Sequence, residues 1–400
     1  MPNSAYSMED LGDRSHIEVN SVNNEVALEL LAKVMDWQLD KAVDEMRWWK
    51  LISAVKYDGY RDFLAGARFL ESLVGWLLQF SEEDREAAYK FARHRLVYVS
   101  ALERERLIQA MYPRTVYPRL LKAVANKAQI PPWKVHKSGE LMKQVRIARR
   151  RTLFLGLSDG ARLDSFRHAN VGGRISNEQV VMGAQLDKRK WADLKKDLTR
   201  DLQHLGADIE PTFDCIYLVD DFSASGTSFL RNEGSDEGAD WKGKLPRFLE
   251  SLGFNEDPIQ ADNWRLIVHH LMITDKACKH LQDSIQEFMA CADECLPRFS
   301  DYEVTYGHKF SERLPVQEGC PLDEEVIPLT DDYYDNAIET PATRKGGVDH
   351  LGMGYAACGL PLVLDHNTPN NSLAMLWAES AGKNGSHQMR PLFRRRQRHE

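Results

Sequence analysis

The chain has 400 residues, of which 43% are hydrophobic, so it is long enough for a large core and has the composition of a globular protein. Its net charge of −8 excludes a uniformly basic nucleic-acid binder, although local basic patches remain open. Residues 1–13 lack the basic and apolar segments of a secretory signal, and no apolar run is long enough to cross a bilayer. The six cysteines complete no zinc pattern. We therefore expect a cytoplasmic protein with free thiols and no membrane partner.

The first third of the chain has a helical pattern. Apolar residues recur at helix spacing from Leu28 to Leu107, without strand-like alternation, and Pro131 and Pro132 end the region. The pattern predicts an all-helical N-terminal domain over residues 1–140 and a second domain over residues 141–400.

Two basic runs flank the second domain. The first consists of Lys143, Arg146, Arg149, Arg150 and Arg151, and the second is the C-terminal tail, residues 390–398. Both could contact nucleic acid, but no interleaved aromatic residues support that interpretation. A solvated helix face and a frayed tail are the simpler interpretation.

Apolar segments separated by helical ones follow. Strands are predicted at residues 152–157, 215–219, 264–273, 300–310 (an edge strand) and 359–364, with helices at 180–205 and 275–295. This alternation predicts an α/β fold with a doubly wound parallel sheet. The glycine patterns of dinucleotide-binding folds and of P-loops are both missing from the sequence.

A polar loop follows the apolar run that ends at Val219. It opens with two adjacent carboxylates, Asp220 and Asp221, at the end of a strand where open α/β sheets bind ligands. Backbone N–H groups, hydroxyls and one glycine follow at the expected start of a helix, which suits a phosphate. These residues are Ser223, Ala224, Ser225, Gly226, Thr227 and Ser228. A phosphate site beside vicinal acids fits a ribose 5-phosphate, whereas the alternative is a simple helix cap.

The loop closely resembles the phosphoribosyl-pyrophosphate loop of type I phosphoribosyltransferases. That loop has two acids after an apolar strand, three variable residues and a Thr/Ser-Gly-x-Thr/Ser turn. The resemblance implies a phosphoribosyltransferase fold and Mg²⁺ near Asp220 and Asp221, held through water. It also places a pyrophosphate loop after the strand at 152–157, at Asp159, Gly160, Ala161 and Arg162. For Arg162, a surface ion pair is an equal alternative. A lid at residues 167–174 is another expectation of the same kind.

The last predicted strand leads into a second polar segment. His366, Asn367, Asn370 and Asn371 follow it, and side-chain amides and an imidazole suit reading a base edge or orienting a water. Because parallel strands present their carboxyl ends at one edge, these residues should lie near Asp221, with His366 in a catalytic role. The alternative is a tight turn at Pro369.

Three segments in this order, residues 154–162, 220–228 and 360–371, resemble the phosphoribosyltransferase-like effectors of bacterial conflict systems, some of which accompany retrons. The resemblance implies a toxic effector of antiphage defence, restrained by a partner such as a retron-type reverse transcriptase with its nucleic acid or a DNA-binding protein. We expect an enzyme that binds phosphoribosyl pyrophosphate or a nucleotide and makes or breaks an N-glycosidic or pyrophosphate bond. The alternatives are a catalytically silent nucleotide sensor and an interaction subunit, and a homo-oligomer stays open.

Overall fold

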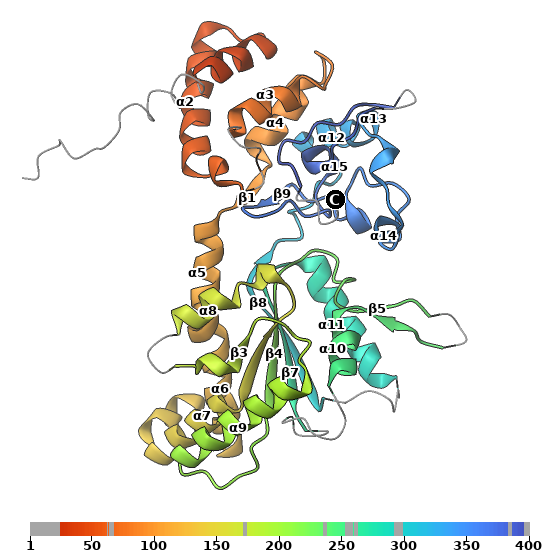
Figure 1. The fold of residues 1–400 in the computed structure, drawn as a ribbon. Helices are drawn as coiled ribbons and strands as arrows, with labels where there is room; N and C mark the ends of the chain where they lie inside the picture. The colour runs from red at the N-terminus through yellow and green to blue at the C-terminus, as the bar shows by residue number, and fades with distance from the viewer. Residues whose placement is uncertain are drawn as a thin grey trace, which may run out of the picture. The chain divides into compact units, whose positions relative to one another are not determined.

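The structure, a computed structural model, describes residues 25–61, 63, 68–170, 174–234, 238–252, 259, 263–291, 299–382 and 386–395 (Figure 1). The chain forms two compact units. One unit ends at Ala101 and resumes at Pro315, and the other, the sheet unit, spans Leu102–Leu314. These limits do not coincide with the division at residue 140 drawn from the sequence.

The sheet unit contains five parallel strands in the order β3-β2-β4-β7-β8. Their bounds are β2 Thr152–Gly156, β3 Val180–Val181, β4 Cys215–Ser223, β7 Arg265–Thr274 and β8 Asp301–Phe310. The predicted α/β fold with a parallel sheet is confirmed, and β8 is the expected edge strand. The chain moves outward from β2 in opposite directions, to β3 on one side and to β4 on the other. The carboxyl ends of β2 and β4 therefore form the switch point where such sheets bind ligands.

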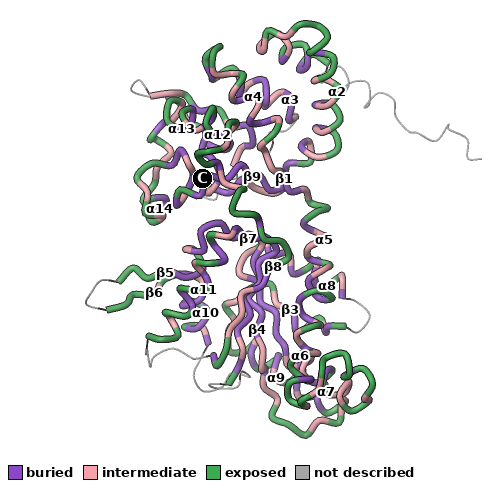
Figure 2. Tube along the Cα trace, turned by 180° about the vertical axis from the view of Figure 1, so that it is seen from behind, coloured by how far each residue is buried: buried purple, intermediate pink, exposed green. Residues whose placement is uncertain are grey.

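Apolar cores lie on both faces of this sheet, as the alternation along each strand requires. Leu153, Leu155 and Leu218 face one core, and Phe154 and Tyr217 face the other. The first core is covered by α9 (Lys188–His204), α10 (Lys244–Ser251) and α11 (Asp275–Ala290). The second is covered by α5 (Ala101–Met111), α6 (Tyr117–Lys127), α7 (Gly139–Arg150) and α8 (Leu163–Ala169). Figure 2 shows the sheet buried between these layers.

Two sequence predictions in this unit need correction. The helix expected over residues 180–205 begins only at Lys188, where the Asp187 side chain accepts a hydrogen bond from the Lys190 backbone N–H. Val180–Val181 instead pairs with β2 as β3. The phosphate-type loop is also not followed directly by a helix, because the hairpin of β5 (Arg231–Asn232) and β6 (Trp241–Lys242) comes first.

The other unit combines N-terminal helices with the C-terminal part of the chain. Its helices are residues 25–34, α2 Leu39–Val55, α3 Phe69–Leu77, α4 Arg85–His94, α12 Pro321–Val326, α13 Leu329–Asp332, α14 Pro341–Arg344 and α15 Ala374–Trp377. One core joins both parts, and the Trp76 indole N–H donates to the Met375 carbonyl at 2.7 Å. This shared core explains why residues after 315 leave the sheet unit.

A short strand interrupts the predicted all-helical region. β1 (Val97–Val99) pairs in parallel with β9 (Leu362–Leu364), in a two-stranded sheet of its own. The last predicted strand is therefore real, but it does not belong to the five-stranded sheet, as had been expected. Among the residues that the structure describes, no helix has the length and apolar character needed to span a membrane.

Candidate functional site

The switch point between β2 and β4 brings together the carboxylates predicted from the sequence. Asp220 and Asp221 lie within β4, which continues to Ser223 rather than ending at Val219. Asp220 is buried, and Asp221 is half-buried. The Ser158 hydroxyl, just after β2, donates to Asp220 Oδ1 at 2.5 Å and lies 3.4 Å from Asp221 Oδ1. The sheet thus joins two loops that are about sixty residues apart in the chain.

The loop after β2 is shaped around Asp221. Asp159, Gly160 and Ala161 form one 3₁₀ turn, and a Cβ placed on Gly160 would collide with the Asp221 carboxylate. Arg162 pairs with Asp164 at 3.2 Å at the surface. Its role toward pyrophosphate therefore stays a prediction, whereas the close approach of the loop to Asp221 is a direct result of the glycine.

Lys244, which sequence reasoning missed, completes the cluster. It is the first residue of α10, and its ammonium group forms an ion pair with Asp220 Oδ2. Burial raises the pKa of Asp220 to about 6, an effect that Lys244 opposes and Asp221 reinforces. His270 stands opposite Asp220 on β7, and burial together with Lys244 lowers its pKa to about 3. His270 is therefore neutral at physiological pH.

The loop from Ser223 to Ser228 has the features of an anion site. The Ser225 and Thr227 hydroxyls share a hydrogen bond at 2.9 Å. Within the described part of the chain, the backbone N–H groups of Ser225, Gly226 and Ser228 donate to no acceptor. Gly226 has φ +81°, and a Cβ there would meet the His280 ring, so glycine is required. Unused N–H groups in such a turn are suited to a phosphate.

The β5–β6 hairpin is an insertion between this loop and its helix. The Lys244 N–H donates to the Ser228 carbonyl at 3.2 Å, and the Leu245 N–H donates to Phe229 at 3.0 Å. The first turn of α10 therefore packs directly against the end of the loop, although the hairpin separates the two in the chain. This arrangement places Lys244 beside Asp220, and no local pattern in the sequence signals it.

A cavity of about 490 Å³ opens beside the cluster. The β2 loop with Ser158 and Asp159 forms one wall, the segment after β3 forms a second, and α10 supplies Lys244 and Arg247. Of these two cations, Lys244 already pairs with Asp220, and Asp159 adds a carboxylate to the lining. In volume the cavity falls within the range of small-molecule sites.

The distal predicted residues belong to the other unit. His366 Nδ1 lies 3.2 Å from the buried Asp365 carboxylate, and the Asn371 side chain donates to the Tyr355 carbonyl at 3.1 Å. The Asn367 backbone closes a turn with Leu364, and the Asn370 carbonyl accepts a hydrogen bond from the Tyr355 N–H at 2.7 Å. Since β9 lies outside the five-stranded sheet, the shared-edge argument for these residues is wrong, and their acceptor role stays a prediction. Gly172 and Gly173, expected in a lid, lie outside the described residues.

Comparison with known proteins identifies a family for this chain. No curated protein and no solved structure is significantly similar to the chain. A family model, PRTase-CE, matches residues 73–395, which is more than half of the chain and includes both the β2 and β4 loops. The chain therefore belongs to the PRTase-CE family, the phosphoribosyltransferases of conflict systems.

Proposed function

We propose that the protein is a phosphoribosyltransferase-like enzyme that binds phosphoribosyl pyrophosphate, or a nucleotide related to it, at the β2–β4 switch point. The observation that carries the proposal is the meeting of Ser158, Asp220 and Asp221 beside a loop with unused backbone N–H groups. In this assignment the loop at 223–228 holds the 5-phosphate. Asp221 and Asp220 accept hydrogen bonds from the ribose hydroxyls.

The 490 Å³ cavity is assigned to the pyrophosphate. Lys244 and Arg247 line it together with Asp159 of the β2 loop. When the bond between ribose C1 and oxygen breaks, both electrons leave with the pyrophosphate, so cations at that wall stabilise the departing charge. A base nitrogen or a water then bonds to C1 and gives up a proton. Positioning and electrostatics suffice for this chemistry, and no protein nucleophile is required.

Magnesium fits this site as a partner of the substrate rather than as a resident metal. No group of three or more His, Cys, Asp or Glu side chains that could hold a metal occurs among the described residues. Two carboxylates are a set that Mg²⁺ uses together with waters and substrate phosphates. We assign a magnesium-bound water to Asp220 and Asp221, the two carboxylates beside the β2 loop. Bound Mg²⁺ would neutralise charge on the pyrophosphate.

We further propose that the activity serves antiphage defence, as a toxic effector in the cytoplasm restrained by a partner of the retron type. Membership of a conflict-system family supports this proposal. The second candidate, a silent nucleotide sensor, is favoured by the Lys244–Asp220 ion pair, because Lys244 neutralises a carboxylate that would stabilise positive charge on the ribose during catalysis.

Calorimetry on two matched variants tests the ligand. The double substitution Asp220→Asn with Asp221→Asn should abolish binding of phosphoribosyl pyrophosphate while the fold survives. The control is Asp193→Asn with Asp208→Asn, which removes the same charge from exposed positions and should bind like the wild type. Equal affinity in the wild type and the first variant would refute the site.

Incubation with a panel of bases, nucleotides and phosphoribosyl pyrophosphate, followed by mass spectrometry, separates the two candidate functions. Turnover by the wild type supports the enzyme. Binding without turnover of any member of the panel supports the sensor instead.

A further inference from the structure

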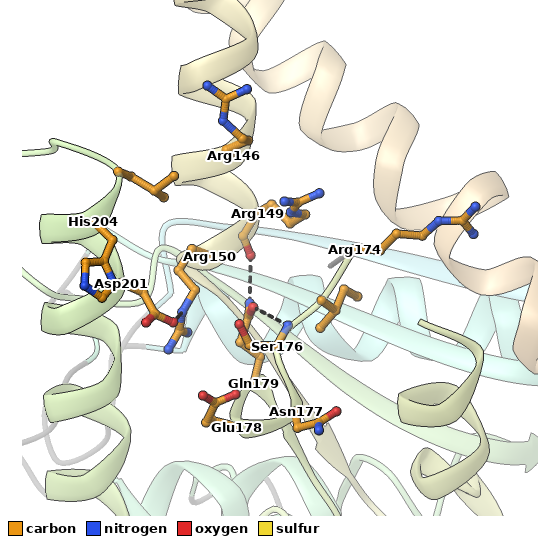
Figure 3. A pocket seen from close by; sticks show the side chains of 12 residues that line it. Arg146, Arg149, Arg150, Arg174, Ser176, Asn177, Glu178, Gln179, Asp201 and His204 are labelled. Atoms are coloured by element: carbon orange, nitrogen blue, oxygen red, sulfur yellow. Dashed lines mark hydrogen bonds and ion pairs between the residues drawn. The ribbon is translucent and has the colours of Figure 1, made fainter. Parts of the chain in front are cut away.

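The basic run that precedes β2 forms one wall of a second cavity in the sheet unit. This cavity has a volume of about 470 Å³ and is lined by Arg146, Arg149 and Arg150 of α7 and by Arg174 (Figure 3). It lies at the amino end of β2, next to Thr152, whereas Ser158 follows the carboxyl end. The length of β2 separates the two places by roughly 13 Å. The arginine cavity is therefore not part of the proposed active site.

The segment at 176–179, which forms one wall of the arginine cavity, is held against the sheet by hydrogen bonds. The buried Gln179 side chain donates to the Thr152 carbonyl at 2.5 Å and to the Arg149 carbonyl at 2.8 Å. Its oxygen accepts from the Ser176 N–H at 3.2 Å. These bonds fix the segment at 176–179 against both α7 and β2, so the cavity has a fixed wall rather than a loose loop.

Arg150 is the unusual member of the lining. Its side chain is only 6% exposed, and its Nε donates to Asp201 at 2.7 Å. Both terminal nitrogens, Nη1 and Nη2, are buried without an acceptor in the described part of the chain. Figure 3 shows the guanidinium beside Asp201 with Glu178 nearby. Buried N–H donors cost stability unless acceptors reach them, so the two terminal nitrogens of Arg150 are suited to oxygen atoms of a bound group or of water.

The charge balance specifies the sign of that group. Four arginine residues contribute to the lining of the cavity, against two acidic residues, Asp201 and Glu178. Arg200, outside the lining, lies 3.2 Å from Asp201 and 3.4 Å from Glu178 and neutralises part of that charge. Among the described residues, no carboxylate pairs with the other three lining arginines, Arg146, Arg149 and Arg174. An excess of planar, bidentate donors is the arrangement that recognises phosphate.

We infer that the arginine cavity binds a small polyphosphate, the di- or triphosphate group of a nucleotide or free pyrophosphate. The volume lies within the range of small-molecule sites. Among the described residues that line the cavity there is no phenylalanine, tyrosine or tryptophan, and His204 supplies the one imidazole ring. The cavity therefore lacks the series of stacking platforms on which single-stranded nucleic acid is usually bound. We therefore expect the arginine cavity to recognise the phosphate groups of its ligand rather than a series of nucleic-acid bases.

Calorimetric titration of the full-length chain with ATP and with pyrophosphate tests the inference. Arg146→Ser with Arg149→Ser should weaken binding of at least one probe by about tenfold or more, because two charge-assisted contacts are lost. Lys134→Ser with Lys137→Ser, two exposed cations near the opposite end of α7, is the matched control and should bind like the wild type. The ATP and pyrophosphate arms show whether a nucleoside adds affinity.

Glu178→Gln removes a repelling carboxylate and should tighten binding by roughly threefold, a gain that misfolding cannot produce. Binding of the probes should persist in the Asp220→Asn and Asp221→Asn variant. The experiment therefore tests the arginine cavity independently of the proposed active site. Unchanged affinity after loss of both arginines would overturn the inference. It would also be overturned if a 5′-phosphorylated single-stranded oligonucleotide bound through these arginines while both small probes did not.

Discussion

Lys244→Met should destabilise the sheet unit by about 2 kcal/mol, because it leaves the Asp220 carboxylate buried without its cation. The Asp220 side chain is 5% exposed and that of Lys244 is 29% exposed. Removing one partner of a fully buried pair costs about 3–5 kcal/mol, and exposed pairs contribute about 0–1 kcal/mol. The partly exposed lysine places this pair between the two limits. In a unit of this size, the loss corresponds to a decrease in Tm of roughly 4–8 °C.

The effect should also depend on pH. Burial already holds the pKa of Asp220 at about 6, above its ordinary value of 3.8. Between those values the folded state binds more protons than the unfolded state, so stability falls as pH rises through that window. Loss of Lys244 raises this pKa further and extends the window upward. The Tm deficit should thus be largest near about pH 8 and smallest near about pH 4.

Thermal unfolding by scanning fluorimetry across this pH range measures both effects. Lys242→Met is the matched control, because Lys242 pairs with Asp240 at a surface where both side chains are about half exposed, and it should leave Tm unchanged. In the Asp220→Asn background, Lys244→Met should cost little, since no buried carboxylate remains. An equal Tm loss in both backgrounds, or a loss independent of pH, would refute the reasoning.

Three further substitutions test other parts of the molecule. Gly160→Ala should displace the Asp221 carboxylate and weaken binding of phosphoribosyl pyrophosphate by about tenfold with little change in Tm, and normal calorimetric affinity would contradict this. Arg95→Met should lower the free energy of unfolding of the unit that ends at Ala101 and resumes at Pro315 by about 3 kcal/mol, as measured by urea denaturation. The reason is that Arg95 forms a two-point ion pair with the buried Asp323 at 2.6 and 2.8 Å. His366→Ala should reduce turnover, or toxicity in cells, without lowering Tm if the distal loop shapes the acceptor site. Wild-type activity in that variant would remove the assignment.

The sequence predicted those features of the fold whose cause is local. The strand predicted at 215–219 is recognisable because a strand buried on both faces is continuously apolar, whereas its continuation to Ser223 through two aspartates was not predicted. The loop after it is recognisable because acids, hydroxyls and Gly226 are neighbours in the chain. Helix α9 begins later than predicted because Val180 and Val181 fit a strand as well as a helix, and pairing with β2 decides between them.

The features that were missed depend on contacts between distant residues. Lys244 is one of two lysines in the charged stretch at 236–244, and no local pattern distinguishes it from Lys242. The hydrogen bonds of α10 to Ser228 and Phe229 bring it to Asp220. Likewise, the three residues Leu362–Leu364 indicate a strand but carry no information about its partner. Pairing with β1 rather than with the central sheet is decided by the core around Trp76, which no local pattern reveals.

The unit that ends at Ala101 and resumes at Pro315 is discontinuous in the chain, and this affects how the chain folds during synthesis. Trp76 and its acceptor Met375 are 299 residues apart in the chain. Strand β1 likewise cannot pair until β9 has been synthesised. At typical translation rates, the N-terminal helices would spend roughly 15–60 s without the other half of their core, exposing apolar surface to chaperones and to aggregation. The segment Leu102–Leu314, in contrast, contains its whole sheet and can form as soon as it emerges. A fragment ending at residue 140 should therefore aggregate when expressed alone, whereas one spanning 102–314 should be soluble.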